Sequence, residues 1–80
     1  MYMVINNYQS NDTLPYVVSV ANDFQTFDDA MKAAKDSAED AMVNQYAEKY
    51  RADEIEMETA SISVYIKGPD FIDWWNIVKV

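Results

Sequence analysis

The segment from residue 26 to residue 51 constrains the fold more than any other part of this chain. It contains no glycine and no proline and is rich in alanine, the residue with the highest helix propensity. Thr26 followed by Asp29 matches a capping box, in which the Thr hydroxyl accepts an early backbone N–H of a helix. Apolar side chains recur at the helical period along one stripe: Phe27, Met31, Ala34, Ala38, Ala41 and Met42. The segment therefore predicts one long helix, from about Thr26 to about Arg51, whose alanines let it lie close to a sheet.

Two β-rich segments precede this helix. Met1 to about Tyr8 is rich in Tyr, Val and Ile, and Tyr16–Val20 follows Pro15, where the start of a strand tolerates proline. The polar residues between them supply turn chemistry, so an antiparallel hairpin is the simplest arrangement. Met1–Ile5 lacks the basic region and the long apolar stretch of a signal peptide, and we expect a strand there instead.

The chain after the helix predicts further strands. In residues 55–67 the apolar residues change from odd-numbered positions, Ile55 and Met57, to even-numbered positions, Val64 and Ile66. We expect one strand here, with a β-bulge near Thr59 that reconciles its two halves. Gly68-Pro69-Asp70 predicts a turn. Residues 71–80 fit either a helix face or a strand, and their β-branched side chains favour a fourth strand that returns antiparallel to residues 55–67.

These elements predict an α+β fold. The expected architecture has two layers, a small antiparallel sheet of three to four strands with one long helix packed on one face, in the order ββαββ. We expect residues 1–80 to form a single compact domain, since a chain of 80 residues is near the lower end of what folds alone. No apolar stretch approaches the roughly 18 residues that a membrane-spanning helix needs.

The residue types exclude most catalytic chemistry. The chain contains no histidine and no cysteine, which removes thiolate and imidazole zinc sites and most activated nucleophiles. A pair of carboxylates can still act as general acid and base, but so short a chain leaves little room for a substrate cleft. We therefore expect a protein that is not an enzyme and that holds no cofactor and no metal.

Acidic side chains are the main candidates for function, because the chain has 14 Asp and Glu against 6 Lys and Arg, a net charge of −8. The densest cluster comprises Asp53, Glu54, Glu56 and Glu58. If Ile55 and Met57 face the helix, Glu56 and Glu58 lie together on the other face of the strand. Three interpretations are open for these two residues: solvated side chains that pair with Lys67 or Lys79, part of a partner-binding surface, or ligands of a hard cation. The segment lacks the glycine turn that a calcium-binding loop contains.

The outer face of the helix is a second acidic surface, with Asp29, Asp36 and Asp40 opposite the apolar stripe. Lys32 precedes Asp36 by four residues and Lys35 precedes Glu39 by four, so intrahelical ion pairs neutralise part of this face. The face is either a solvated helix surface or one presented to a basic partner. Carboxylates spaced along a helix and a neighbouring strand can imitate a row of phosphates.

The chain has six Tyr, three Phe and two Trp, more than one face of a small sheet can bury. We expect some of them on the face away from the helix: Tyr2, Tyr8, Tyr16, Tyr65 and one of Trp74 or Trp75. Exposed aromatic side chains are typical of protein-binding surfaces and of dimer interfaces. Base stacking needs a basic surround, so direct binding of nucleic acid is excluded, and an acidic surface is equally unsuited to anionic membranes.

Two functions remain. The first is a small inhibitor that docks on a larger basic, nucleic-acid-binding protein, in one version as a DNA mimic, through Asp53, Glu54, Glu56, Glu58, Asp29, Asp36, Asp40 and Tyr65. In size, acidity and aromatic content the chain resembles phage-encoded antagonists of host defence, the anti-CRISPR and anti-restriction proteins, which implies a viral protein in the host cytoplasm. The second is a structural module that forms a homodimer, with acidity serving solubility. The absence of cysteine fits a cytoplasmic location in either case.

Overall fold

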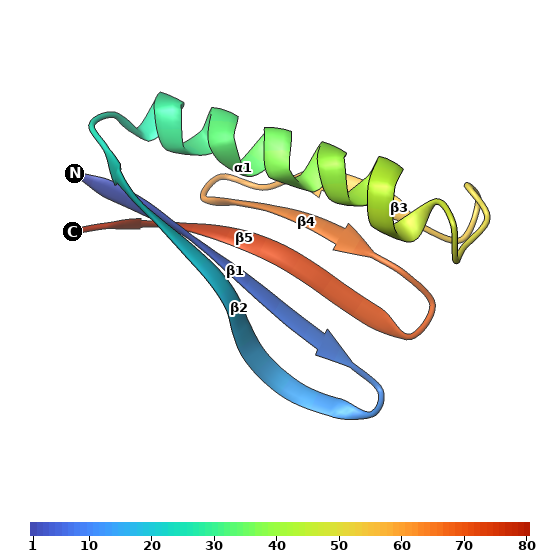
Figure 1. Cartoon of the computed structure of the whole chain (residues 1–80). Helices are drawn as coiled ribbons and strands as arrows, with labels where there is room; N and C mark the ends of the chain where they lie inside the picture. The colour runs from blue at the N-terminus through green and yellow to red at the C-terminus, as the bar shows by residue number, and fades with distance from the viewer.

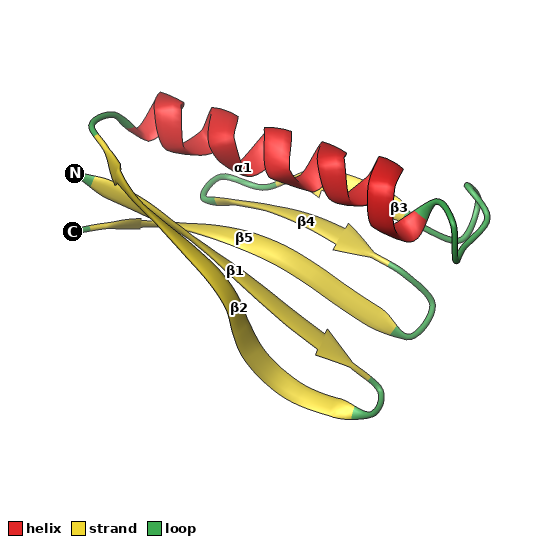
Figure 2. Ribbon diagram, in the orientation of Figure 1, coloured by secondary structure: helices red, strands yellow, loops and turns green.

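The computed structural model describes residues 1–80 and places a helical layer across one face of an antiparallel sheet (Figure 1). In chain order the elements are β1 (Tyr2–Ser10), β2 (Thr13–Phe24), α1 (Phe27–Ala41), a π-helical segment η1 (Met42–Tyr46), β3 (Glu56–Thr59), β4 (Ser63–Lys67) and β5 (Phe71–Lys79). The five strands lie in the order β2-β1-β5-β4-β3, so the first and last strands of the chain are hydrogen-bonded neighbours (Figure 2). This long-range pairing decides which residues share each face of the sheet.

The expected ββαββ fold with three to four strands is wrong, because the sheet has five strands. The difference lies in residues 55–67, which form two antiparallel strands, β3 and β4, instead of one bulged strand. The Ala60 N–H donates to the Ser63 carbonyl oxygen at 2.8 Å and closes the turn between them. The change of parity in the sequence therefore marks a hairpin. Its turn contains no Gly, Pro, Asn or Asp, and Ser61 is the only residue in it of a type common in turns, so the local sequence marks it weakly.

Two hairpins were predicted correctly. β1 and β2 pair antiparallel, and β5 is a strand that returns antiparallel to β4 after the turn at Gly68–Asp70. Gly68 is needed there for space, because a Cβ atom at this position would collide with the ring of Phe71. That ring stacks on Tyr46 with centroids 4.5 Å apart, so it has little freedom to move aside.

The helix is confirmed, with the predicted cap, but it ends earlier than Arg51. The Thr26 Oγ1 accepts the backbone N–H of Asp29 at 3.1 Å, and Ala34 and Ala38 are fully buried against the sheet. After Ala41 an α-helical step of four residues would bury Gln45, whereas the wider π-helical turn of η1 buries Tyr46 and leaves Gln45 exposed. The insertion of one residue therefore brings Tyr46 onto the sheet.

The core lies between the buried alanines of the helical layer and the inner sides of β1, β4 and β5. Its larger members are Tyr46, Ile55, Ile66, Phe71, Trp75 and Ile77. The β1–β2 hairpin extends away from α1 (Figure 1), and β2 is exposed along nearly its whole length. The helix therefore covers one face of the sheet incompletely and leaves the other face bare. No helix in the structure has the length and apolar character that a membrane span requires.

Candidate interaction surface

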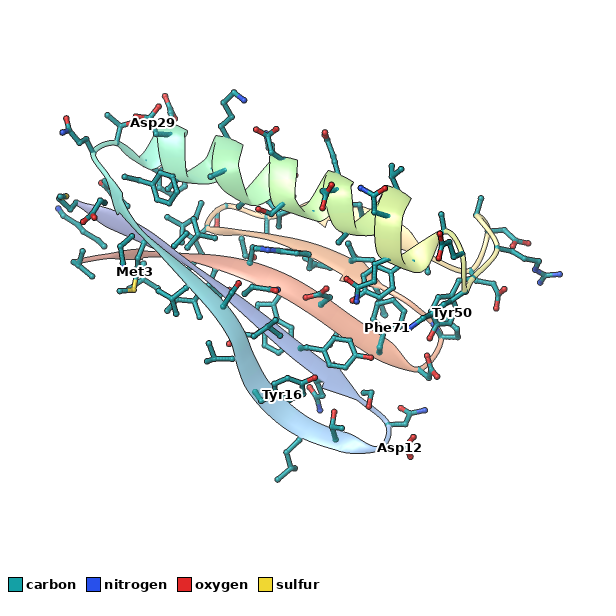
Figure 3. All side chains as sticks on the ribbon, in the orientation of Figure 1. Met3, Asp12, Tyr16, Asp29, Tyr50 and Phe71 are labelled. Carbon is teal, nitrogen blue, oxygen red and sulfur yellow. The ribbon has the colours of Figure 1, made fainter.

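The face of the sheet away from α1 carries no covering layer, and we call it the open face. Side chains alternate along each strand, and partners across neighbouring strands lie on the same face, so the strand register identifies its members. Its larger apolar side chains come from four strands: Met3, Ile5, Val17, Val20, Tyr65, Ile72, Trp74 and Val78. Figure 3 shows Met3 on this side of the sheet and Asp29 on the outer side of α1. The two lie on opposite sides of the molecule.

One cross-strand row of the open face combines aromatic and acidic side chains. Glu58 of β3 is opposite Tyr65 of β4, and Tyr65 is opposite Trp74 of β5. The Tyr65 hydroxyl donates to Glu58 Oε2 at 2.5 Å, and this hydrogen bond to the carboxylate raises the pKa of Tyr65. Tyr65 therefore remains neutral at physiological pH and holds one oxygen of Glu58 in place. Next to this row the open face has a shallow hollow of about 280 Å³, lined by Gln9, Ser63, Tyr65, Ile72 and Trp74.

The predicted acidic cluster is divided between this face and the adjoining loop. Glu56 and Glu58 are exposed on β3, with Glu56 opposite Lys67 in the register. Asp53 and Glu54 precede β3, where Arg51 Nε lies 3.4 Å from Asp53 Oδ1 and 3.3 Å from Glu54 Oε1. The loop carboxylates are thus partly neutralised locally, whereas Glu56 and Glu58 have no ion pair.

The predicted helix acids lie on the other layer of the molecule. Asp29 is in the first turn of α1, and Asp36 pairs with Lys32 at 2.8 Å as expected, while the expected pair of Lys35 with Glu39 does not form. Asp36 and Asp40 border a polar groove of about 710 Å³ between the helical layer and β1–β2. The eight predicted partner-binding residues therefore do not form one surface. Glu56, Glu58 and Tyr65 share the open face, Asp53 and Glu54 lie in the adjoining loop, and the three helix acids lie on the other layer.

The expected placement of the aromatic side chains is correct for Tyr65 and Trp74 and wrong for the three tyrosines of the first hairpin. Tyr2 packs edge-on against Phe27 of α1 with ring centroids 6.0 Å apart. Tyr8 stacks on Phe71, and Tyr16 packs on Tyr8. Tyr2 and Tyr8 alternate in phase with the buried Val4 of β1, which places them on the helix side of the sheet. Tyr16 lies on the same side because it is opposite Tyr8 in the register.

The structure also contains a buried polar network that the sequence reasoning missed. Asp73, only 5% exposed, accepts hydrogen bonds from Asn6 Nδ2 and from the Tyr46 hydroxyl, each at 2.6 Å. Burial raises the pKa of Asp73, although both hydrogen bonds oppose that shift. Burial and the hydrogen bond to Asp73 raise the pKa of Tyr46 far above its usual value. The sequence of β5 does contain a signal of this burial, because Asp73 alternates in phase with the apolar residues Phe71, Trp75 and Ile77.

This network is a structural feature of the core, because all three groups satisfy one another and no buried side-chain polar atom lacks a partner. No group of three or more Asp and Glu side chains converges on a point where a metal ion could be held. The fold and its surfaces thus define a small helix-on-sheet protein with one bare, mixed aromatic and acidic face. No family model matches the chain, and no curated protein and no solved structure matches it either.

Proposed function

We propose that this protein is a small inhibitor that acts by binding, without catalysis, and docks through the open face on a larger basic protein. The observation that carries the proposal is the row Glu58–Tyr65–Trp74 on a sheet face that no other layer covers. Trp and Tyr are enriched among the residues that dominate binding energy at protein interfaces. Carboxylates at the border of the row, Glu56 and Glu58, set the charge of the partner.

A nucleic-acid-binding protein is the proposed partner, because a protein that grips a phosphate backbone must present a dense basic surface. A net charge of −8 on 80 residues steers such a partner toward this one. In the DNA-mimic version, Asp29, Asp36 and Asp40 on the outer helix add a second acidic surface, on the opposite layer from the open face. Anti-CRISPR and anti-restriction antagonists include DNA mimics of this kind, and in such a role the protein would act in the cytoplasm of the host cell.

Capture from a lysate of candidate host cells tests the proposal. The protein immobilised at low salt should retain a nucleic-acid-binding protein that is released as NaCl is raised and is displaced by added duplex DNA. The double variant E56Q/E58Q should lose this capture. The matched control D12N/E48Q removes the same charge from two exposed residues outside both proposed surfaces and should retain it. Capture that is indifferent to salt, or equal for both double variants, would refute docking through the open face.

A homodimer is the second candidate, and the apolar half of the open face favours it. Met3, Ile5 and Val78 lie together beside Val20, which is 50% exposed. Two such faces could pack against each other. Edge-to-edge pairing is disfavoured, because β3 is short and carries two Glu, and the register between β1 and β2 is broken by irregularities.

Light scattering across a range of concentrations separates these candidates. A mass of 9.2 kDa at every concentration indicates a monomer and supports an open face that is free for a partner. A stable mass of twice that value, reduced to the monomer by Ile5→Lys, would favour the homodimer.

A further inference from the structure

The hollow on the open face has the dimensions and the lining of a site for one side chain. Its volume is about 280 Å³, and Tyr65, Ile72 and Trp74 are three of its five lining residues. Gln9 and Ser63 add an amide and a hydroxyl at its border. Tyr65, Ile72 and Trp74 are partly exposed, so the hollow is open to a protruding group from another protein.

A negative charge lies within reach of this hollow. Glu58 is next to Tyr65 in the cross-strand row, and strands in a sheet are about 4.8 Å apart. Its Oε2 accepts the Tyr65 hydroxyl, whereas Oε1 accepts no hydrogen bond within the protein. Lys67 belongs to the same face, but it lies opposite Glu56 in the register and makes no ion pair with Glu58. The carboxylate of Glu58 is therefore oriented and still has an unoccupied oxygen.

Arginine is the side chain that uses all of these features. Its planar guanidinium stacks on aromatic rings and donates to carboxylates in a fixed fork, and its methylene stem packs on apolar surface. Lysine has a compact, strongly hydrated ammonium that makes poorer use of a flat ring. An apolar side chain would fill the hollow but leave Glu58 unused.

We propose that the hollow receives an arginine side chain of the basic partner. The aliphatic stem lies against Trp74, and the guanidinium stacks at Tyr65 and pairs with the free oxygen of Glu58. This assignment rests on the proposed function and adds to it the residue by which the partner is recognised.

The test is a nuclear magnetic resonance titration of the whole chain with three blocked peptides, Gly-Arg-Gly, Gly-Lys-Gly and Gly-citrulline-Gly. The arginine peptide should shift the Trp74 indole N–H and the backbone signals of Ser63 and Tyr65. The lysine peptide should bind about tenfold more weakly, and citrulline, which is uncharged, should bind more weakly still. Because the probe is a peptide, the result does not depend on finding the natural partner.

Two variants assign the effect to the site. E58Q at an exposed position should lower the affinity for the arginine peptide about tenfold, while E48Q, which removes the same charge at an exposed residue outside the proposed surfaces, should leave it unchanged. W74L should also weaken binding. If W74L does not fold, Y65L removes the other ring and should weaken binding in the same way.

Several results would overturn the assignment. The first two are equal binding of the arginine and lysine peptides and equal losses in E58Q and E48Q. The others are shifts centred on the groove at Asp36 and Asp40, or a stable dimer whose Trp74 signal does not respond to the arginine peptide. If the peptides fail while salt-dependent capture through Glu56 and Glu58 succeeds, the arginine site is wrong and the proposed function stands. If capture also fails, the function itself is wrong.

Discussion

Asp73 is the only charged residue whose side chain is buried, and its environment gives it an unusual titration. Burial raises its pKa above the ordinary value, because the ionised form loses hydration. The protonated form is therefore favoured more by the folded state than by the unfolded chain. The resulting contribution to stability is fully present below the unfolded pKa and is lost as the pH rises through the folded pKa.

The variant D73N tests this, because Asn is uncharged and its Oδ1 can still accept the Tyr46 hydroxyl. Urea denaturation at a series of pH values from neutral to acid should show that the wild type gains stability relative to D73N as the pH falls. Other carboxylates titrate alike in both proteins, so the difference isolates Asp73. D70N is the matched control, since Asp70 accepts the Tyr50 hydroxyl at 2.9 Å but is exposed. A wild type that instead loses stability relative to D73N on acidification would mean that the hydrogen bonds outweigh burial.

At the scale of single elements, the alanine stripe determines how closely α1 approaches the sheet. Ala30, Ala34 and Ala38 are each 0% exposed, so no space separates them from the strands. A larger side chain at these positions must displace the helix from β4 and β5. Protein interiors are packed as densely as organic crystals, and added methylenes therefore cost free energy.

We expect A34L to lower the free energy of unfolding by about 1–3 kcal/mol, because leucine overpacks the helix–sheet contact. S37L places the same side chain on the exposed part of α1 and should change the stability by no more than about 0.5 kcal/mol. Urea denaturation monitored by circular dichroism measures both. An A34L protein as stable as S37L would show that the helix is less closely packed than the structure has it.

The elements also show what local patterns can and cannot predict. The Thr26 cap, the burial of Ala34 and Ala38 and the β1–β2 hairpin depend on residues near one another in the chain, and all three were predicted. Ala30 is also fully buried, but the predicted stripe did not include it. The β3–β4 hairpin was missed because its parity change fits a bulge equally well and its turn carries no glycine or proline. The π-helical turn was missed because the contact that accompanies it, the hydrogen bond from Tyr46 to Asp73, joins residues 27 positions apart.

In the candidate surface, too, the features set by neighbouring residues were predicted and those set by distant residues were not. Alternation alone placed Glu56 and Glu58 on the outer side of β3, and Tyr65 and one tryptophan on the open face. The helix acids were expected to share one docking surface with these residues. They do not, because Asp29, Asp36 and Asp40 lie on the other layer of the molecule. Tyr2 and Tyr8 were assigned to the wrong face, because β1 has apolar side chains at both odd and even positions. Alternation therefore does not show which of its two faces is buried.

At the scale of the whole molecule, the net charge of −8 has opposite consequences for folding and for binding. Few carboxylates are paired, since the ion pairs involve only Lys32 and Arg51. Mutual repulsion of the remaining acids destabilises the compact state, and dissolved salt screens that repulsion. The same screening weakens attraction to a basic partner.

We expect the melting temperature to rise by about 4–8 °C between low and moderate NaCl, which corresponds to about 1 kcal/mol for a domain of this size. Differential scanning calorimetry measures it. The double variant E39K/E48K halves the net charge and should show a smaller rise. A melting temperature that falls with added NaCl would show that ion pairs contribute more to stability than repulsion costs.

The sequence by itself determined the helix and its cap, the two hairpins with clear turns, the acidity, and which residues share a side of each strand. These follow from propensity and from side-chain periodicity, which act over a few residues. Only the tertiary structure decided that β5 pairs with β1, that the helix lies on the side of Val4 and Tyr8, and that Glu58, Tyr65 and Trp74 form one row on a bare face. Periodicity assigns residues to the two sides of an element, but the side that is buried depends on pairing between distant segments.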